Sequence, residues 1–291
     1  MLMLALALAA APMQDALPLP EGNAYVRALV DRHRLREDAV DSYAYDLTEQ
    51  REELDGKGRA TRRESRRYQV FHVRGRAVRT LVEENGAPLP RGRAEREAGE
   101  ARAQAQAIGA GRVAVERPAL RLSEVLARCD FRTVAREDVG GRPALVLEFQ
   151  PRPDAPADGG LGGQPRSGVS PQGPRAGIHS RSEPPKAGDR FLRRLAGRVW
   201  IDEAEGQVVR AQIRNTAPFR VAGGLGASVS AFEMSLEYRK VDGAVWLPLH
   251  RQTTVSGRKL LLKTFRVRST STYGEFRRFS VEADEKVHAD R

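Results

Sequence analysis

GRVWIDEAEGQVVRAQIRN, residues 197–215, combines two runs of alternating apolar residues with a short acidic segment between them. Apolar residues such as Val199 and Ile201 occupy every second position before a short polar segment, and Val209, Ala211 and Ile213 alternate in the same way after it. Alternation with a period of two is typical of half-buried β-strands. The stretch therefore predicts an antiparallel hairpin with one apolar face, joined through residues 202–206.

The connection of this hairpin carries three carboxylates, Asp202, Glu203 and Glu205. Such a cluster is compatible with a metal site, an acid/base pair or the tip of a hairpin. The five histidines of the chain are scattered, without HExxH spacing, and no serine lies in a GxSxG motif. We therefore interpret the carboxylates as a solvated loop tip and predict no catalytic residue, no cofactor and no metal. A periplasmic hydrolase would need a clustered nucleophile or a carboxylate dyad. Loss of turnover on substitution of Asp202 would support that class, and we expect none.

Further strand patterns follow the same period on both sides of the hairpin. Residues 43–54 read YAYDLTEQREEL and are followed by the turn signal DGKG, and further turn signals are ENG at 84–86 and the glycine pair at 140–141. The VDG turn at 241–243 leads into a strand in which Pro248 indicates an edge or a bulge. Nine or ten antiparallel strands are expected in all, and so large a sheet should curl.

Three segments carry helical patterns instead. Residues 23–40 place Val26, Leu29, Val30 and His33 on one helical face. Residues 91–110 are rich in Ala, Glu, Arg and Gln without an apolar stripe, which favours an exposed helix or a mobile segment that nothing holds to a core. Residues 122–131 predict a further short helix. The lone Cys129 excludes an intramolecular disulfide and is expected to be a small buried apolar residue.

Two regions fall outside the strand and helix patterns. Residues 1–22 contain an apolar run of about ten residues followed by alanines, the pattern of a secretory signal peptide. Residues 151–190 contain eight prolines and eight glycines, which predicts a disordered insertion within one sheet. The remainder, residues 23–291, is predicted to form a single domain.

The net charge of the 291-residue chain is +11, and its basic residues are almost all arginine, with six lysines. The arginines are spread along the chain without a nucleic-acid-binding module, so no nucleic acid is expected as a partner. A general attraction to anionic membrane surfaces remains open on charge alone. With 40% hydrophobic and 30% charged residues, the chain can build a sizeable core.

The order of the elements and several local strings resemble the LolA/LolB superfamily of periplasmic outer-membrane lipoprotein-sorting and carrier proteins. The strings that carry the resemblance are YAYDL, ESRRYQVFHVRGR, LEFQPRP, LAGRVWIDEAEGQVVRAQI and VDGAVWLPLHRQT. The resemblance implies a mainly β (α+β) fold, in which a curled antiparallel sheet forms an unclosed half-barrel with helices covering its open side. Alternation alone leaves open whether the apolar face is filled core or an acyl-binding cleft.

The resemblance also implies a function: a periplasmic, non-enzymatic carrier that holds the acyl chains of a lipoprotein or lipid in a hydrophobic cavity. Its partners would be the acylated cargo and components of lipoprotein transport in the inner and outer membranes. The alternative is an envelope sensor or scaffold of the same fold that acts through protein contacts. Alternation selects the following lipid-binding or core residues: Leu145, Leu147, Phe149, Val199, Ile201, Phe232, Met234 and Leu236.

Overall fold

The computed structural model describes residues 18–37, 42–112, 128–152, 191, 193–221, 227–243, 245–259 and 263–278. The signal peptide predicted for residues 1–22 and the insertion predicted for 151–190 lie almost entirely outside these ranges, and both stay predictions. Among the described residues, no helix is both long enough and apolar enough to cross a membrane.

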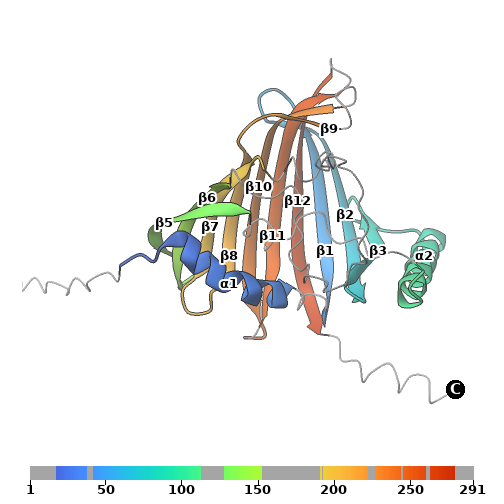
Figure 1. The fold of residues 1–291 in the computed structure, drawn as a ribbon. Helices are drawn as coiled ribbons and strands as arrows, with labels where there is room; N and C mark the ends of the chain where they lie inside the picture. Colours follow the sequence, from blue (N-terminus) through green and yellow to red (C-terminus); the bar gives the residue numbers. More distant parts are fainter. Residues whose placement is uncertain are drawn as a thin grey trace, which may run out of the picture.

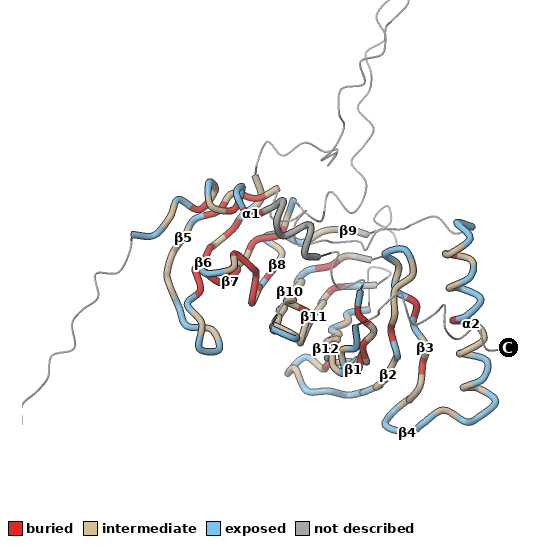
Figure 2. The backbone as a smooth tube through the Cα atoms, turned by 90° about the horizontal axis from the view of Figure 1, so that it is seen from below, coloured by how far each residue is buried: buried red, intermediate tan, exposed pale blue. Residues whose placement is uncertain are grey.

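Twelve strands of the described chain form one antiparallel sheet (Figure 1). Along the sheet their order is β4-β3-β2-β1-β12-β11-β10-β8-β7-β6-β5, and β9 pairs with β10 off this path. The sheet begins at β4 and ends at β5, which do not pair with each other, and it curls without closing (Figure 2). The strands are β1 (Tyr43–Leu54), β2 (Ala60–Val73), β3 (Arg76–Glu84), β4 (Ala87–Pro88), β5 (Cys129–Asp138), β6 (Pro143–Pro151), β7 (Leu195–Asp202), β8 (Val208–Asn215), β9 (Phe219–Val221), β10 (Ala227–Val241), β11 (Val245–Lys259) and β12 (Lys263–Arg278).

The predicted mainly β fold with an unclosed half-barrel is therefore confirmed. The hairpin predicted for residues 197–215 is formed by β7 and β8, in which Val199 pairs with Ala211. Pro248 lies beside a register shift, because Glu237 pairs with His250 and the next residue, Tyr238, pairs with Pro248. The missing N–H of the proline is thus accommodated at a bulge, as the sequence predicted.

Helix α1 (Gly22–Glu37) packs on one face of the sheet, which we call the α1 face. The carboxylate of Glu21 accepts hydrogen bonds from the backbone N–H groups of Asn23 (3.0 Å) and Ala24 (2.6 Å), so it caps the helix. Asn23 in turn accepts a hydrogen bond from the backbone of Phe131 (2.7 Å), which ties the helix to β5. Val26 and Leu29 are buried in the core cluster, as the helical spacing predicted.

Helix α2 (Arg91–Gly109) confirms a helix in the Ala-rich segment, but the expectation that nothing holds it to a core is wrong. Its Ala101 and Ile108 are 5% and 2% exposed and pack with Val78 of β3. Through the strand register, Val78 lies on the face opposite the α1 face. Burial of these two apolar side chains is enough to dock a helix that has no apolar stripe.

The helix predicted for residues 122–131 is corrected at its C-terminal end. Cys129, Asp130 and Phe131 belong to strand β5 and pair with β6, while residues 113–127 lie outside the described ranges. A strand forms here instead of a helix because Cys129 and Phe131, two residues apart, are both buried on the same face of the sheet. Burial also raises the pKa of the Cys129 thiol to about 12, so the thiol is not a reactive thiolate.

Candidate functional site

The eight residues selected by alternation come together in one cluster on the α1 face. Leu145, Leu147 and Phe149 from β6 and Val199 and Ile201 from β7 are at most 4% exposed and pack beneath α1. Phe232, Met234 and Leu236 from β10 pack against them and remain half-buried. The first five side chains therefore belong to the packed core. The last three form its partly exposed margin. Their role in lipid binding stays a prediction.

The margin continues as an apolar strip along β10 and onto the next two strands. In the register, Phe232 of β10 lies opposite Val255 of β11, which lies opposite Val267 of β12. The strip, all half-buried, consists of Phe232, Met234, Leu236, Tyr238, Val255 and Val267. Phe191 stacks edge-on against Phe232, with ring centroids 5.0 Å apart, at one end of the strip. Half-exposed apolar side chains on an unclosed sheet provide surface that an acyl chain could cover.

A cation lies beside this strip. Arg251 of β11 is opposite Leu236 of β10, and its guanidinium donates a hydrogen bond to the hydroxyl of Ser271 at 3.0 Å. The strip therefore places a positive group within one strand spacing of apolar side chains. This combination suits an amphiphile with an anionic headgroup.

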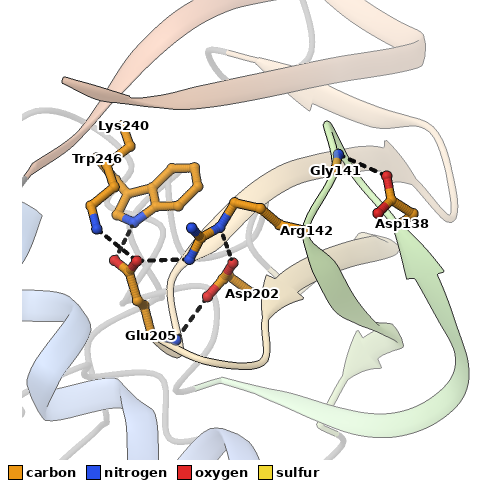
Figure 3. Close-up of polar contacts among 7 residues, drawn as sticks. All are labelled: Asp138, Gly141, Arg142, Asp202, Glu205, Lys240 and Trp246. Atoms are coloured by element: carbon orange, nitrogen blue, oxygen red, sulfur yellow. Dashed lines mark hydrogen bonds and ion pairs between the residues drawn. The ribbon is translucent and has the colours of Figure 1, made fainter. Parts of the chain in front are cut away.

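The three carboxylates of the β7–β8 connection are not a solvated tip, so that interpretation is corrected. Asp202 is 1% exposed; its Oδ2 accepts a hydrogen bond from Arg142 Nε at 2.6 Å and its Oδ1 one from the Glu205 backbone N–H at 2.7 Å (Figure 3). Glu203 pairs with Arg136 at 2.8 Å. The connection is thus folded back against the β5–β6 turn instead of projecting into water.

Glu205 joins this connection to the β10–β11 hairpin (Figure 3). Its Oε1 accepts from Lys240 Nζ and from Arg142 Nη2, both at 2.7 Å, and its Oε2 accepts from the indole N–H of Trp246 at 2.9 Å. The hydrogen bond from Lys240, followed by that from Trp246, lowers the pKa of Glu205 to about 2. Alternation could not reveal Arg142, Lys240 and Trp246 as partners, because they lie in other hairpins. The described residues contain no group of three metal-ligating side chains that could hold an ion.

The lowered pKa of Glu205 makes its contribution to stability depend on pH. We expect Glu205→Gln to lower the free energy of unfolding at pH 7 by about 2 kcal/mol, since the folded state favours the ionised form. This contribution is present above the ordinary pKa of 4.5 and is lost as the pH falls through about 2. Urea unfolding of the unmodified protein and the variant at a series of pH values measures the difference in their free energies of unfolding. A difference that stays constant from pH 7 to pH 2 would contradict the lowered pKa of Glu205.

A second concave surface lies across β5, β6, β7, β8, β10 and β11, on the face opposite α1. This polar groove has a volume of about 880 Å³. Phe131, Phe149 and Ile213 reach it but are at most 5% exposed, because their side chains point to the α1 face. Its other lining residues include the polar side chains of Arg132, Glu148, Arg198, Gln212, Glu233 and Gln252, together with the half-buried Met234. The charged and amide groups of this groove distinguish it from the apolar strip.

Comparison with known proteins finds no matching family model and no matching curated protein. Solved structures similar to this chain include a domain described as an outer membrane lipoprotein-sorting protein from Vibrio parahaemolyticus (10% identity, TM-score 0.36, covering 93% of this chain and 98% of that one). They also include a DUF1329 family protein from Desulfovibrio piger (11% identity, TM-score 0.37, covering 88% and 94%). A LolA superfamily protein from Nitrosomonas europaea is similar too (9% identity, TM-score 0.34, covering 90% and 96%). Similarity at these values identifies neither a ligand nor a partner of this chain.

Proposed function

We propose that this protein is a periplasmic, non-enzymatic binding protein that holds the acyl chain of a lipid or lipoprotein against the apolar strip of the α1 face. The observation that carries the proposal is the half-buried row Phe232, Met234, Leu236 and Tyr238 on β10, which packs against the buried cluster beneath α1 and stays partly exposed. Each methylene buried there would contribute about 0.8 kcal/mol, so affinity needs no specific polar chemistry. Arg251 would pair with an anionic headgroup beside the strip.

Binding of an apolar ligand is tested directly by native mass spectrometry of protein purified from its own cell envelope. We expect bound lipid or acyl peptide, and we expect a fluorescent fatty acid to be displaced by unlabelled fatty acid in solution. A mass equal to that of the bare chain, together with no binding of the fluorescent probe, would overturn the carrier proposal. That result would favour the envelope sensor or scaffold that acts through protein contacts.

Placing a charge in the strip should weaken binding of the fatty-acid probe. We expect Met234→Glu to raise the probe Kd roughly thirtyfold, the equivalent of two or three buried methylenes. The matched control is Ser235→Glu, because Ser235 is the next residue of β10 and successive side chains of a strand point to opposite faces of the sheet. Equal losses in both variants would show that the strip is not the binding surface. Circular dichroism checks that each variant keeps its strands.

A further inference from the structure

Exposed cations gather at the end of the sheet where the β1–β2 and β11–β12 connections lie, at the top of Figure 1. The two connections are neighbours, because a Cβ built on Gly58 would lie 3.7 Å from Nη1 of Arg266. Five exposed cations at this end have no carboxylate partner among the described residues. We call them the basic end: Arg51, Lys57, Arg258, Lys263 and Arg266.

The remaining charges at this end largely neutralise one another. Arg59 pairs with Asp55 at 2.9 Å, Arg62 with Glu64 at 2.7 Å, and Arg63 with Glu52 at 2.7 Å. Among the carboxylates of β1, β2 and the connection between them, only Glu53 is exposed, and it forms no ion pair with a described residue. The opposite end of the sheet has no such excess, since four exposed carboxylates accompany three exposed arginines that have no carboxylate partner among the described residues: Glu137, Asp138, Asp242, Glu275, Arg74, Arg239 and Arg278. Of the two ends of the described sheet, only the basic end therefore carries an excess of exposed positive charge.

The basic end adjoins one end of the apolar strip. Val267 is the neighbour of Arg266 in β12, and Val255 precedes Arg258 by three residues in β11. Cations beside apolar residues are the composition of surfaces that rest in the headgroup region of a bilayer. A polynucleotide would instead call for exposed aromatic rings among the cations. The aromatic residue between Lys263 and Arg266 is Phe265, and its ring is half-buried beside Gly257, on which a built Cβ would lie 3.0 Å from it.

We propose that the basic end docks on bilayers that contain anionic phospholipids and thereby brings the strip to the membrane from which an acyl chain enters. The part of this proposal in which an acyl chain passes from the membrane to the strip rests on the proposed function. Docking on the membrane requires only the positive charges of the basic end. Because the attraction is electrostatic, it should weaken as salt shortens the screening length.

Docking is tested by sedimentation of the full chain with vesicles of equal parts phosphatidylglycerol and phosphatidylcholine. We expect binding at low salt that is lost at high salt, and no binding to vesicles of phosphatidylcholine alone. The variant Arg258→Glu, Lys263→Glu, Arg266→Glu should bind the anionic vesicles roughly a hundredfold more weakly. The matched control reverses three exposed arginines on or just after α2, Arg96→Glu, Arg102→Glu and Arg112→Glu, and should bind within a fewfold of the unmodified chain.

Equal losses in the two triple variants would overturn the proposal, because binding would then follow net charge and not the basic end. Tighter binding to a short DNA duplex than to the vesicles, lost in the basic-end variant, would also overturn it in favour of a polynucleotide surface. The fatty-acid probe separates this test from that of the proposed function. The basic-end variant should keep probe binding in solution, whereas Met234→Glu should keep vesicle binding.

Discussion

Gly197→Ala in β7 is expected to cost at least about 3 kcal/mol of folding free energy and to leave little folded protein. A Cβ at this position would lie 1.9 Å from the backbone oxygen of Gln212 in β8 and 3.0 Å from the ring of Phe149. The first contact is with backbone that is hydrogen-bonded within the sheet, so no flexible side chain can move aside. Relief would require β7 and β8 to separate where they flank the core cluster.

The matched control is Gly274→Ala in β12, because a Cβ there would meet nothing within 4 Å. Both substitutions place the same methyl group on a strand, so the difference isolates the close approach. Thermal and urea unfolding, followed by circular dichroism, measure both variants. If Gly197→Ala proved as stable as Gly274→Ala, β7 and β8 would not approach as closely as the structure has them.

The strands were predictable because their signal is local. The alternating run from Tyr43 to Leu54 is strand β1 residue for residue, and the turn signals after it mark the ends of β1 and β3. The eight apolar residues of the candidate site were also found in one cluster, since a period of two assigns side chains to a face without knowledge of pairing. What alternation could not give is which part of that face stays open. That depends on which elements distant in the chain pack over the face.

The features missed by sequence reasoning depend on partners that are distant in the chain. Residues 129–131 followed a helical pattern, and only pairing with β6 makes them a strand. The Ala-rich helix docks through Ala101 and Ile108 on a patch of β3 that no property of residues 91–110 indicates. Asp202 looked solvated because its partner Arg142 is 60 positions away, and the partners of its neighbour Glu205, Lys240 and Trp246, are 35 and 41 positions away. A carboxylate in a polar turn stays solvated only if folding brings no cation from a distant part of the chain into contact with it.

Asp202→Ala is expected to lower the free energy of unfolding by about 3 kcal/mol. The substitution removes a carboxylate that is 1% exposed and leaves the guanidinium of Arg142 without its shorter ion pair. It also removes the acceptor for the Glu205 backbone N–H, so the turn that holds Glu205 against Lys240 and Trp246 loosens. The loss of unfolding free energy should exceed that of Glu205→Gln, because Asp202 holds both the Arg142 guanidinium and the backbone turn that positions Glu205. Urea unfolding at pH 7 measures it.

Asp138→Ala is the matched control, since Asp138 has the same role in the neighbouring turn but is exposed (Figure 3). Its Oδ1 accepts the Gly141 backbone N–H at 2.8 Å, and no cation pairs with it among the described residues. We expect its removal to cost less than about 1 kcal/mol, the range for a solvated hydrogen bond. If the two alanine variants lost equal stability, burial of Asp202 against Arg142 would contribute nothing. The carboxylate turn would then be the solvated tip that its sequence suggests, and the link between the β7–β8 and β10–β11 hairpins would have to be carried by Glu205 alone.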